Sequence, residues 1–256
     1  MFTAYFDASG KPDSYLVTVA GYIASADRWT KIEAEWNKAL TEFGLGFLHM
    51  SELKPDHRIG DILKRFATIL TTWASYGIAS SVETGAFSSN SFSLQSALLF
   101  AEPYCPAAMY SIMSVEDWAK RRNYNGPLAF VFENGDRKHE FLKAYNSAYR
   151  KFPKDLRSVT FAAKTRPALQ SADMLAYLMR YGVSHEINGI RIPHDWRGEA
   201  LTRLCRGVIQ SRWYSKEQIE QLGERFDAIM DSEPGARRRL LGDRIKQSRR
   251  KRSRPH

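Results

Sequence analysis

The sequence contains two short apolar runs that each lead directly into an acidic residue, and these runs limit the folds open to the chain. Phe2–Phe6 is followed by Asp7 and a turn, and Leu128–Phe132 is followed by Glu133 and a turn. Apolar runs of this length, bounded by turn residues, are typical of buried strands. A carboxylate at the end of a buried strand is costly to bury unless it is paired or bound to a cation.

Other hydrophobic patterns predict further strands and helices around these two runs. Strand patterns cover residues 15–24, 77–84 and 158–162, and helical patterns begin near residues 25, 59, 106, 141, 168 and 215. Gly44 is expected to end the first of these helices, and Gly77 the second. The first three strands can form an antiparallel meander, whereas the later strands alternate with helices and should pair in parallel. The predicted fold class is therefore α/β, with a mixed sheet flanked by helices and a helical insertion at residues 25–76.

The helical segment at residues 168–184 carries a third acid. The segment is apolar on most sides, apart from one seam formed by Gln170, Asp173, Tyr177 and Arg180 at spacings of three and four residues. An acid on a mostly apolar helix needs a partner, because carboxylates are rarely buried alone. Asp173 is therefore a candidate site residue.

The predicted topology allows the three acids to converge. Asp7 and Glu133 would stand at the carboxyl ends of neighbouring strands, and Asp173 would face both from the last helix of the sheet. Three clustered carboxylates repel one another, and a Mg²⁺ or Mn²⁺ ion relieves that repulsion through hard oxygen ligands. Such ions support phosphodiester cleavage. The alternative for Asp173 is a salt bridge with Arg166 or Arg180.

Length and composition indicate one domain of residues 1–235, followed by a tail. None of the apolar runs in the 256 residues approaches the roughly 20 needed to span a bilayer. Asp7 stands where a signal peptide would have its apolar core, so secretion by that route is not expected. Two cysteines, Cys105 and Cys205, make neither a disulfide framework nor a zinc site, which favours the reducing cytosol.

The net charge of +10 is concentrated in the last 21 residues. Residues 236–256 contain ten Lys and Arg against the single acid Asp243, which leaves residues 1–235 close to neutral. Such a block predicts a disordered tail that is attracted to nucleic acid phosphate. An anionic membrane surface is the weaker alternative, because the tail lacks an apolar face. The candidate nucleic-acid-binding residues in the tail are Arg237, Arg238, Arg239, Arg249, Arg250, Lys251 and Arg252.

Four short motifs, in this order along the chain, resemble those of the DUF3800 family. They are YFDASG at residues 5–10, VAGY at 19–22, FLHMSEL at 47–53 and LQSADMLAY at 169–177. The resemblance covers roughly residues 1–185 and implies a ribonuclease H-like fold. It also implies an origin in bacteria or phages, where members of the family often lie beside mobile elements and defence genes. In ribonuclease H-like nucleases the acids lie at the ends of strands one and four and on the last helix, which correspond here to Asp7, Glu133 and Asp173.

The chain departs from the family pattern at two of these positions. Ala8 stands where the commonest first motif, DESG, has Glu, which leaves Asp7 without an acidic neighbour. Glu133 stands where many ribonuclease H-like enzymes have Asp. Asp136, three residues later, is a rival for the same role. Two plain structural alternatives remain open: Asp7 as a turn residue, since Asp is common in turns, and Glu133 as a solvated strand end.

The resemblance also points to residues around the acids. His49 and Glu52 match a family motif and could act as a proton shuttle or extra ligands; the alternative for His49 is a hydrogen-bonded structural role. Ser9 could donate a hydrogen bond beside Asp7 or serve the turn. Gln170 could orient a ligand or cap its helix.

Basic and aromatic residues complete the set of predictions. Lys164 and Arg166 precede the last helix of the sheet and could contact phosphate, or could simply be solvated. Trp29, Trp36 and Trp73 are expected to be core residues.

Two functional interpretations follow. The first is a Mg²⁺- or Mn²⁺-dependent nuclease that uses Asp7, Glu133 and Asp173 as metal ligands and is held on RNA or DNA by the basic tail. The second is a nucleic-acid-binding protein on a nuclease-like scaffold without catalysis, because a fold does not by itself imply a function.

Overall fold

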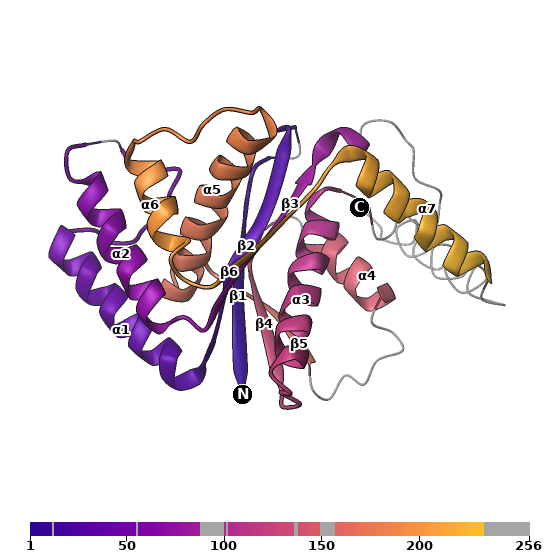
Figure 1. Ribbon diagram of the computed structural model, residues 1–256. Coiled ribbons are helices and arrows are strands. Elements are labelled where there is room, and N and C mark those ends of the chain that lie inside the picture. Colours follow the sequence, from indigo (N-terminus) through magenta and orange to yellow (C-terminus); the bar gives the residue numbers. More distant parts are fainter. Residues whose placement is uncertain are drawn as a thin grey trace, which may run out of the picture.

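The computed structural model describes residues 1–11, 13–54, 56–87, 100, 102–135, 138–148 and 157–232, with side chains at 147–148 and 226–232 left out. A sheet of six strands runs through the molecule, and helices cover both of its faces (Figure 1). The chain is therefore α/β, as predicted from its sequence. Asp136 and the tail at 236–256 lie outside the described residues.

The sheet has the predicted mixed pairing. Its strands are β1 (Phe2–Ser9), β2 (Leu16–Ser25), β3 (Tyr76–Glu83), β4 (Leu128–Glu133), β5 (Arg157–Ala162) and β6 (Ile209–Tyr214), in the order β5-β4-β1-β2-β3-β6. β1, β2 and β3 form the antiparallel meander, and β4 lies parallel to β1 and to β5. Phe6 pairs with Phe132, so Asp7 and Glu133 follow at the same end of neighbouring strands.

Two hydrophobic cores hold the helices against the sheet. One core packs α1 (Ala26–Phe43), α2 (Ile59–Trp73), α5 (Pro167–Ile187) and α6 (Trp196–Leu204) on one face. The other packs α3 (Tyr104–Arg121), α4 (Lys138–Ala148) and α7 (Lys216–Ser232) on the opposite face, beside the short 3₁₀ helix η1 (Thr84–Phe87). In Figure 1 these two groups lie on the left and right of the sheet.

The insertion at residues 25–76 belongs to the first core. Trp29 and Trp36 are buried, as expected, and Trp73 is partly buried against the same cluster. The rings of Trp36 and Phe66 lie 4.3 Å apart, which joins α1 to α2. None of the helices among the described residues is long and apolar enough to cross a membrane.

Two glycines and one serine explain local features of the backbone. Gly44 adopts a left-handed conformation with φ 68° and ends α1. Gly21 in β2 pairs with Phe6 in unbroken register, so it makes no bulge; a Cβ there would collide with the carbonyl oxygen of Tyr5. Ser215 and Gln218 exchange the two hydrogen bonds of a capping box at the start of α7.

Four elements differ from the sequence-based expectation. α2 ends at Trp73 rather than at Gly77, because β3 begins at Tyr76 and takes Gly77 into the sheet. α3 begins at Tyr104, with Pro106 inside its first turn, where a missing N–H costs nothing. α6 and β6 were not expected, since β6 is a half-exposed edge strand and α6 is short and polar.

Candidate functional site: two buried carboxylates around a lysine

Asp7 lies near the end of β1 on the sheet face that α5 covers, and its side chain is only 3% exposed. Oδ1 accepts a hydrogen bond from the Ala8 amide at 2.7 Å. Oδ2 lies 2.8 Å from Nζ of Lys164. The plain turn role is therefore wrong, because this carboxylate is buried within the strand and ion-paired.

Asp173 approaches the same lysine from the second turn of α5. Its Oδ1 lies 3.1 Å from Nζ of Lys164, and its Oδ2 accepts a hydrogen bond from the Met50 amide at 2.7 Å. The side chain is 8% exposed. The alternative of a salt bridge with Arg166 or Arg180 is wrong, since the cation that pairs with Asp173 is Lys164.

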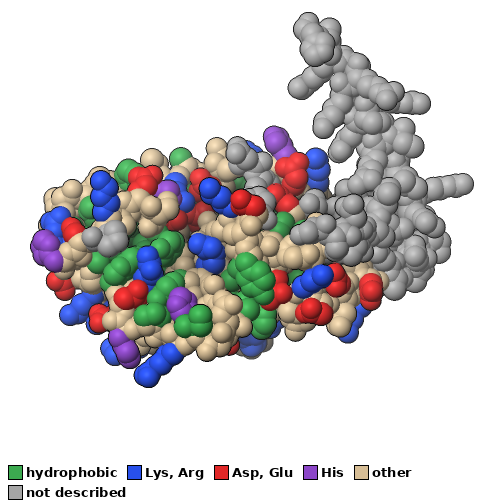
Figure 2. Space-filling model, turned by 90° about the horizontal axis from the view of Figure 1, so that it is seen from above, with side chains coloured by type: hydrophobic (Ala, Val, Ile, Leu, Met, Phe, Trp, Pro, Cys, Tyr) green, Lys and Arg blue, Asp and Glu red, His purple; other side chains and the backbone are tan. Residues whose placement is uncertain are grey.

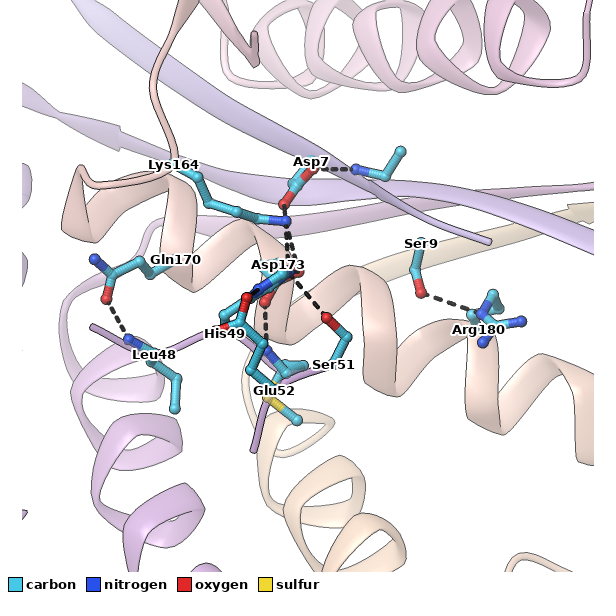
Figure 3. A network of polar contacts seen from close by, with 12 residues as sticks. Asp7, Ser9, Leu48, His49, Ser51, Glu52, Lys164, Gln170, Asp173 and Arg180 are labelled. Atoms are coloured by element: carbon cyan, nitrogen blue, oxygen red, sulfur yellow. Dashed lines mark hydrogen bonds and ion pairs between the residues drawn. The ribbon is translucent and has the colours of Figure 1, made fainter. Parts of the chain in front are cut away.

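Lys164 is the centre of the arrangement. It stands in the connection between β5 and α5, with its ammonium between the two carboxylates (Figure 3). Its side chain is 25% exposed, so it is not simply solvated. From the sequence, Lys164 was predicted to contact phosphate or to be solvated, because no pattern around it indicates that this connection folds inward.

The electrostatics of this triad are dominated by burial. Burial raises the pKa of Asp7 to about 6; Lys164 opposes that rise, and the nearby Asp173 carboxylate adds to it. For Lys164, burial alone would lower the pKa, but the Asp7 and Asp173 carboxylates outweigh it and raise the pKa. Lys164 is therefore positively charged at neutral pH.

His49 joins the cluster from the connection between α1 and α2. Its Nδ1 lies 2.9 Å from Oε1 of Glu52, and its Nε2 lies 3.2 Å from Nζ of Lys164. A protonated lysine can only donate, so Nε2 accepts and Nδ1 carries the proton that is donated to Glu52. The predicted His49–Glu52 pair is thus brought to the site, with a defined tautomer.

Ser51 is a neighbour that sequence reasoning missed. Its Oγ lies 3.1 Å from Nε2 of His49, so the Ser51 hydroxyl and the Lys164 ammonium both donate to this nitrogen. Ser51 belongs to the motif that contains His49, but a serine two residues away carried no separate signal. Figure 3 shows Ser51, His49 and Glu52 grouped below Asp173.

Gln170 positions the connection that carries His49. Its Oε1 accepts hydrogen bonds from the Trp36 indole at 3.0 Å and from the Leu48 amide at 2.9 Å. Its Nε2 donates to the carbonyl oxygen of Thr165 at 3.0 Å. Gln170 therefore holds backbone on both sides of the site, and its described contacts are with neither Asp7 nor Asp173.

Glu133 lies across a cleft from this cluster. The cleft has a volume of about 230 Å³, and its lining consists of Asp7, Ala8, Gly10, Tyr104, Glu133, Gly135, Lys138 and Lys164. Among the described residues, the Glu133 side chain has no ion pair or hydrogen bond. The structure thus brings Glu133 to the same cleft as Asp7 but not into the lysine-centred cluster.

The three predicted acids are carboxylates, which suit a hard divalent cation, and two of them line the cleft. Asp7 and Glu133 both line it, whereas Asp173 is turned toward Lys164 and the Met50 amide. Among the described residues, no group of three or more His, Cys, Asp or Glu side chains is gathered closely enough to hold a metal ion. The cation between Asp7 and Asp173 is the Lys164 ammonium.

Two further predictions concern residues beside the acids. Ser9 does not contact Asp7; its Oγ accepts a hydrogen bond from Nε of Arg180 at 3.1 Å. Arg166 is the N-cap residue of α5, and its side chain is exposed. The seven candidate nucleic-acid-binding residues of the tail lie outside the described residues.

Fold and site together define an α/β protein in which two buried acids, a lysine and a His–Glu pair meet at one end of a mixed sheet. Comparisons with protein-family models, with curated proteins and with solved structures found no match. The functional conclusion therefore depends on the site.

Proposed function

We propose that the chain is a nuclease, a hydrolase of RNA or DNA phosphodiester bonds that requires Mg²⁺ or Mn²⁺. The observation that carries the proposal is the convergence of Asp7, Asp173, Lys164 and His49 at the carboxyl end of β1, beside a cleft that also holds Glu133. Buried, charge-coupled groups that line a cleft are typical of catalytic sites. Ion pairs with a purely structural role would not need to line a cleft, as Asp7 and Lys164 do here.

We further propose that the fold is ribonuclease H-like and that the chain is related to the DUF3800 family. The strand order supports this, because a meander of β1–β3 continues through β4 and β5 in parallel. So do the positions of the acids at the ends of β1 and β4 and on α5. β6 would then be an additional edge strand.

The metal requirement is part of the proposal. Asp7 and Glu133 would hold the ion from the two sides of the cleft, with water in the remaining positions. A bound Mg²⁺ or Mn²⁺ would polarise the phosphoryl oxygens and steady the leaving oxygen. Contact of Asp173 with the same ion would need Lys164 to leave its place between the carboxylates.

The side chains of the chain itself have distinct roles in this proposal. Nε2 of His49 would accept a proton from the attacking water once Lys164 and Ser51 turn away from it, and Glu52 holds the tautomer that makes Nε2 an acceptor. Lys164 balances the charge of Asp7 and Asp173, and it also lines the cleft where a phosphate would bind. Gln170 keeps the segment that carries His49 in position.

The partner and the compartment are proposed on other grounds. The ten basic residues of 236–256 would attract nucleic acid, because the rest of the chain is nearly neutral. In the view onto the end of the sheet, basic and acidic side chains are interspersed over the described surface (Figure 2). Cys105 and Cys205 are not bonded to each other, which supports the cytosol.

A cleavage assay tests the proposal. End-labelled single- and double-stranded RNA and DNA are incubated with Mg²⁺, Mn²⁺ or chelator and resolved on a gel. We expect metal-dependent cleavage by the wild type and by the control Asp27→Asn, which removes an exposed carboxylate of α1. Asp7→Asn and Asp173→Asn should lower the rate by about 1,000-fold. Full activity in either variant would contradict the proposal.

A second candidate, a nucleic-acid-binding protein without catalysis, is favoured by one observation. Lys164 already compensates the charge of Asp7 and Asp173, so the two acids do not need a metal ion. This candidate predicts mobility shifts that fall with salt, ignore Mg²⁺ and disappear on truncation after Gly235, with no cleavage under any condition.

A further inference from the structure

Arg180 is the charged member of the α5 seam that the proposed reaction does not use. It lies on the same helix face as Asp173, seven residues later, which corresponds to about 10 Å along the helix axis. Its Nε donates a hydrogen bond to Oγ of Ser9 at the end of β1. Figure 3 shows Arg180 on the side of Asp173 away from Lys164 and Gln170.

The charge of Arg180 is not balanced by a carboxylate. Among the described residues, its one side-chain partner is the neutral hydroxyl of Ser9, and its side chain is half-buried. Lys164, by contrast, is ion-paired with both Asp7 and Asp173. A guanidinium presents several donors in a fixed fork, and the Ser9 contact uses only the donor at Nε.

The stem of Arg180 lies close to the backbone of Gly10, a residue that lines the cleft. Gly10 lines the cleft, and a Cβ added to Gly10 would lie 3.2 Å from Cδ of Arg180. Gly10 has a φ of 101°, a conformation that suits glycine, and its missing side chain lets the Arg180 stem lie close to the backbone there. Arg180 is thus a neighbour of the cleft lining through Gly10, although its own side chain is not part of that lining.

We propose that Arg180 binds a backbone phosphate of the nucleic acid strand, at a position removed from the bond that lies at Asp7, and that Ser9 orients its guanidinium. The inference rests on the proposed nuclease function for its choice of ligand. It extends that function by giving the substrate a direction across the site, from Asp7 toward Ser9.

Binding in the presence of chelator tests Arg180 independently of catalysis. The full chain is titrated with a labelled eight-nucleotide single strand of RNA or DNA at a series of salt concentrations. Arg180→Ala should weaken binding by about 5- to 20-fold and lower the slope of log K against log salt by about 1. Arg206→Ala, which removes an exposed arginine beyond α6, is the matched control and should stay within twofold. Equal affinity of the two variants would overturn the inference.

Two milder variants keep the test informative if Arg180→Ala does not fold. Arg180→Lys keeps the charge but loses the fork, and Ser9→Ala leaves Arg180 in place without its acceptor. Both should weaken binding by about 2- to 5-fold. Wild-type affinity in both variants would overturn the inference as well.

A neutral-phosphate scan separates this inference from the nuclease proposal. If the wild type cleaves, single methylphosphonate linkages are placed at each position from the cleaved bond. One linkage, away from the cleaved bond, should raise KM in the wild type but not in Arg180→Ala. If the wild type never cleaves while Arg180→Ala still weakens binding, the nuclease proposal fails and the phosphate site stands. If cleavage occurs and every linkage affects both proteins equally, the phosphate site fails alone.

Discussion

The two sides of the cleft differ in how their charges are satisfied. On one side, Asp7 and Asp173 are buried, hydrogen-bonded to backbone amides and paired with Lys164. On the other side, Glu133 ends β4 with no ion pair or hydrogen bond to its side chain among the described residues. The first side is organised before any ligand arrives, whereas the second leaves a carboxylate available. Stability and ligand binding should therefore respond to different residues.

Loss of Lys164 should have the largest effect on stability. Lys164→Met leaves two buried carboxylates without their cation, and we expect the free energy of unfolding at pH 7 to fall by about 3 kcal/mol. Urea denaturation measures it. The control is Lys138→Met on the opposite rim of the cleft, where the side chain lies over the ring of Phe161, and this variant should change stability by less than about 1 kcal/mol. Equal effects of the two variants would remove the distinction between the two sides.

The raised pKa of Asp7 predicts how stability depends on pH. The folded pKa of about 6 lies above the unfolded value, so the folded state binds the proton more tightly. The stability contributed by protonated Asp7 is fully present below about pH 4 and is lost as pH rises through 6, a change of about 3 kcal/mol. Asp7→Asn should lack this loss, and Asp27→Asn should keep it. If the free energy of unfolding had the same dependence on pH in the wild type and in Asp7→Asn, the burial of the Asp7 carboxylate would be contradicted.

Gln170 should have a smaller effect, through the segment that it holds. Gln170→Ala leaves the Trp36 indole and the Leu48 amide without their acceptor, and we expect a loss of about 2 kcal/mol. Hydrogen exchange at the Leu48 and Met50 amides should become faster. Gln221→Ala, at an exposed position on α7, is the control. Unchanged exchange at Leu48 in the Gln170 variant would show that the hydrogen bond does not hold the segment.

Glu133 should have the smallest effect on stability and a large one on activity. Glu133→Gln removes a carboxylate with no described side-chain partner, so the free energy of unfolding should stay within about 0.5 kcal/mol. Metal-dependent cleavage should nevertheless fall by about 100-fold or more. Circular dichroism on urea titration and the gel assay measure the two quantities on the same preparation. Normal cleavage by Glu133→Gln would assign the catalytic role to the Asp7 side alone.

The sequence was sufficient for the parts of the fold that have strong hydrophobic patterns. Continuous apolar runs identified β1 and β4, and the seam on α5 identified Asp173, because burial on nearly all sides leaves a clear signature. The same patterns correctly predicted that Asp7 and Glu133 lie at one end of the sheet. β6 and α6 were missed because an edge strand and a short polar helix lack that periodicity.

The site was less predictable than the fold for a physical reason. The position of Lys164 depends on how the connection after β5 folds back, which no local pattern specifies. The same holds for Ser9, whose partner is Arg180 rather than Asp7. Alternation along a strand predicts the sheet face on which a side chain lies, but not the side chain that it contacts. Contacts between residues far apart in sequence decide which cation meets which acid.

Binding of Mn²⁺ to the purified chain tests the central claim most directly, namely that the cleft between Asp7 and Glu133 takes the metal while Lys164 serves the buried acids. Electron paramagnetic resonance measures free Mn²⁺ during titration of the wild type, Asp7→Asn, Glu133→Gln and the control Asp27→Asn. We predict one bound ion in the wild type and control, with affinity at least about tenfold weaker in the other two variants. Undiminished Mn²⁺ affinity in Asp7→Asn and Glu133→Gln, or no binding by the wild type, would contradict the account.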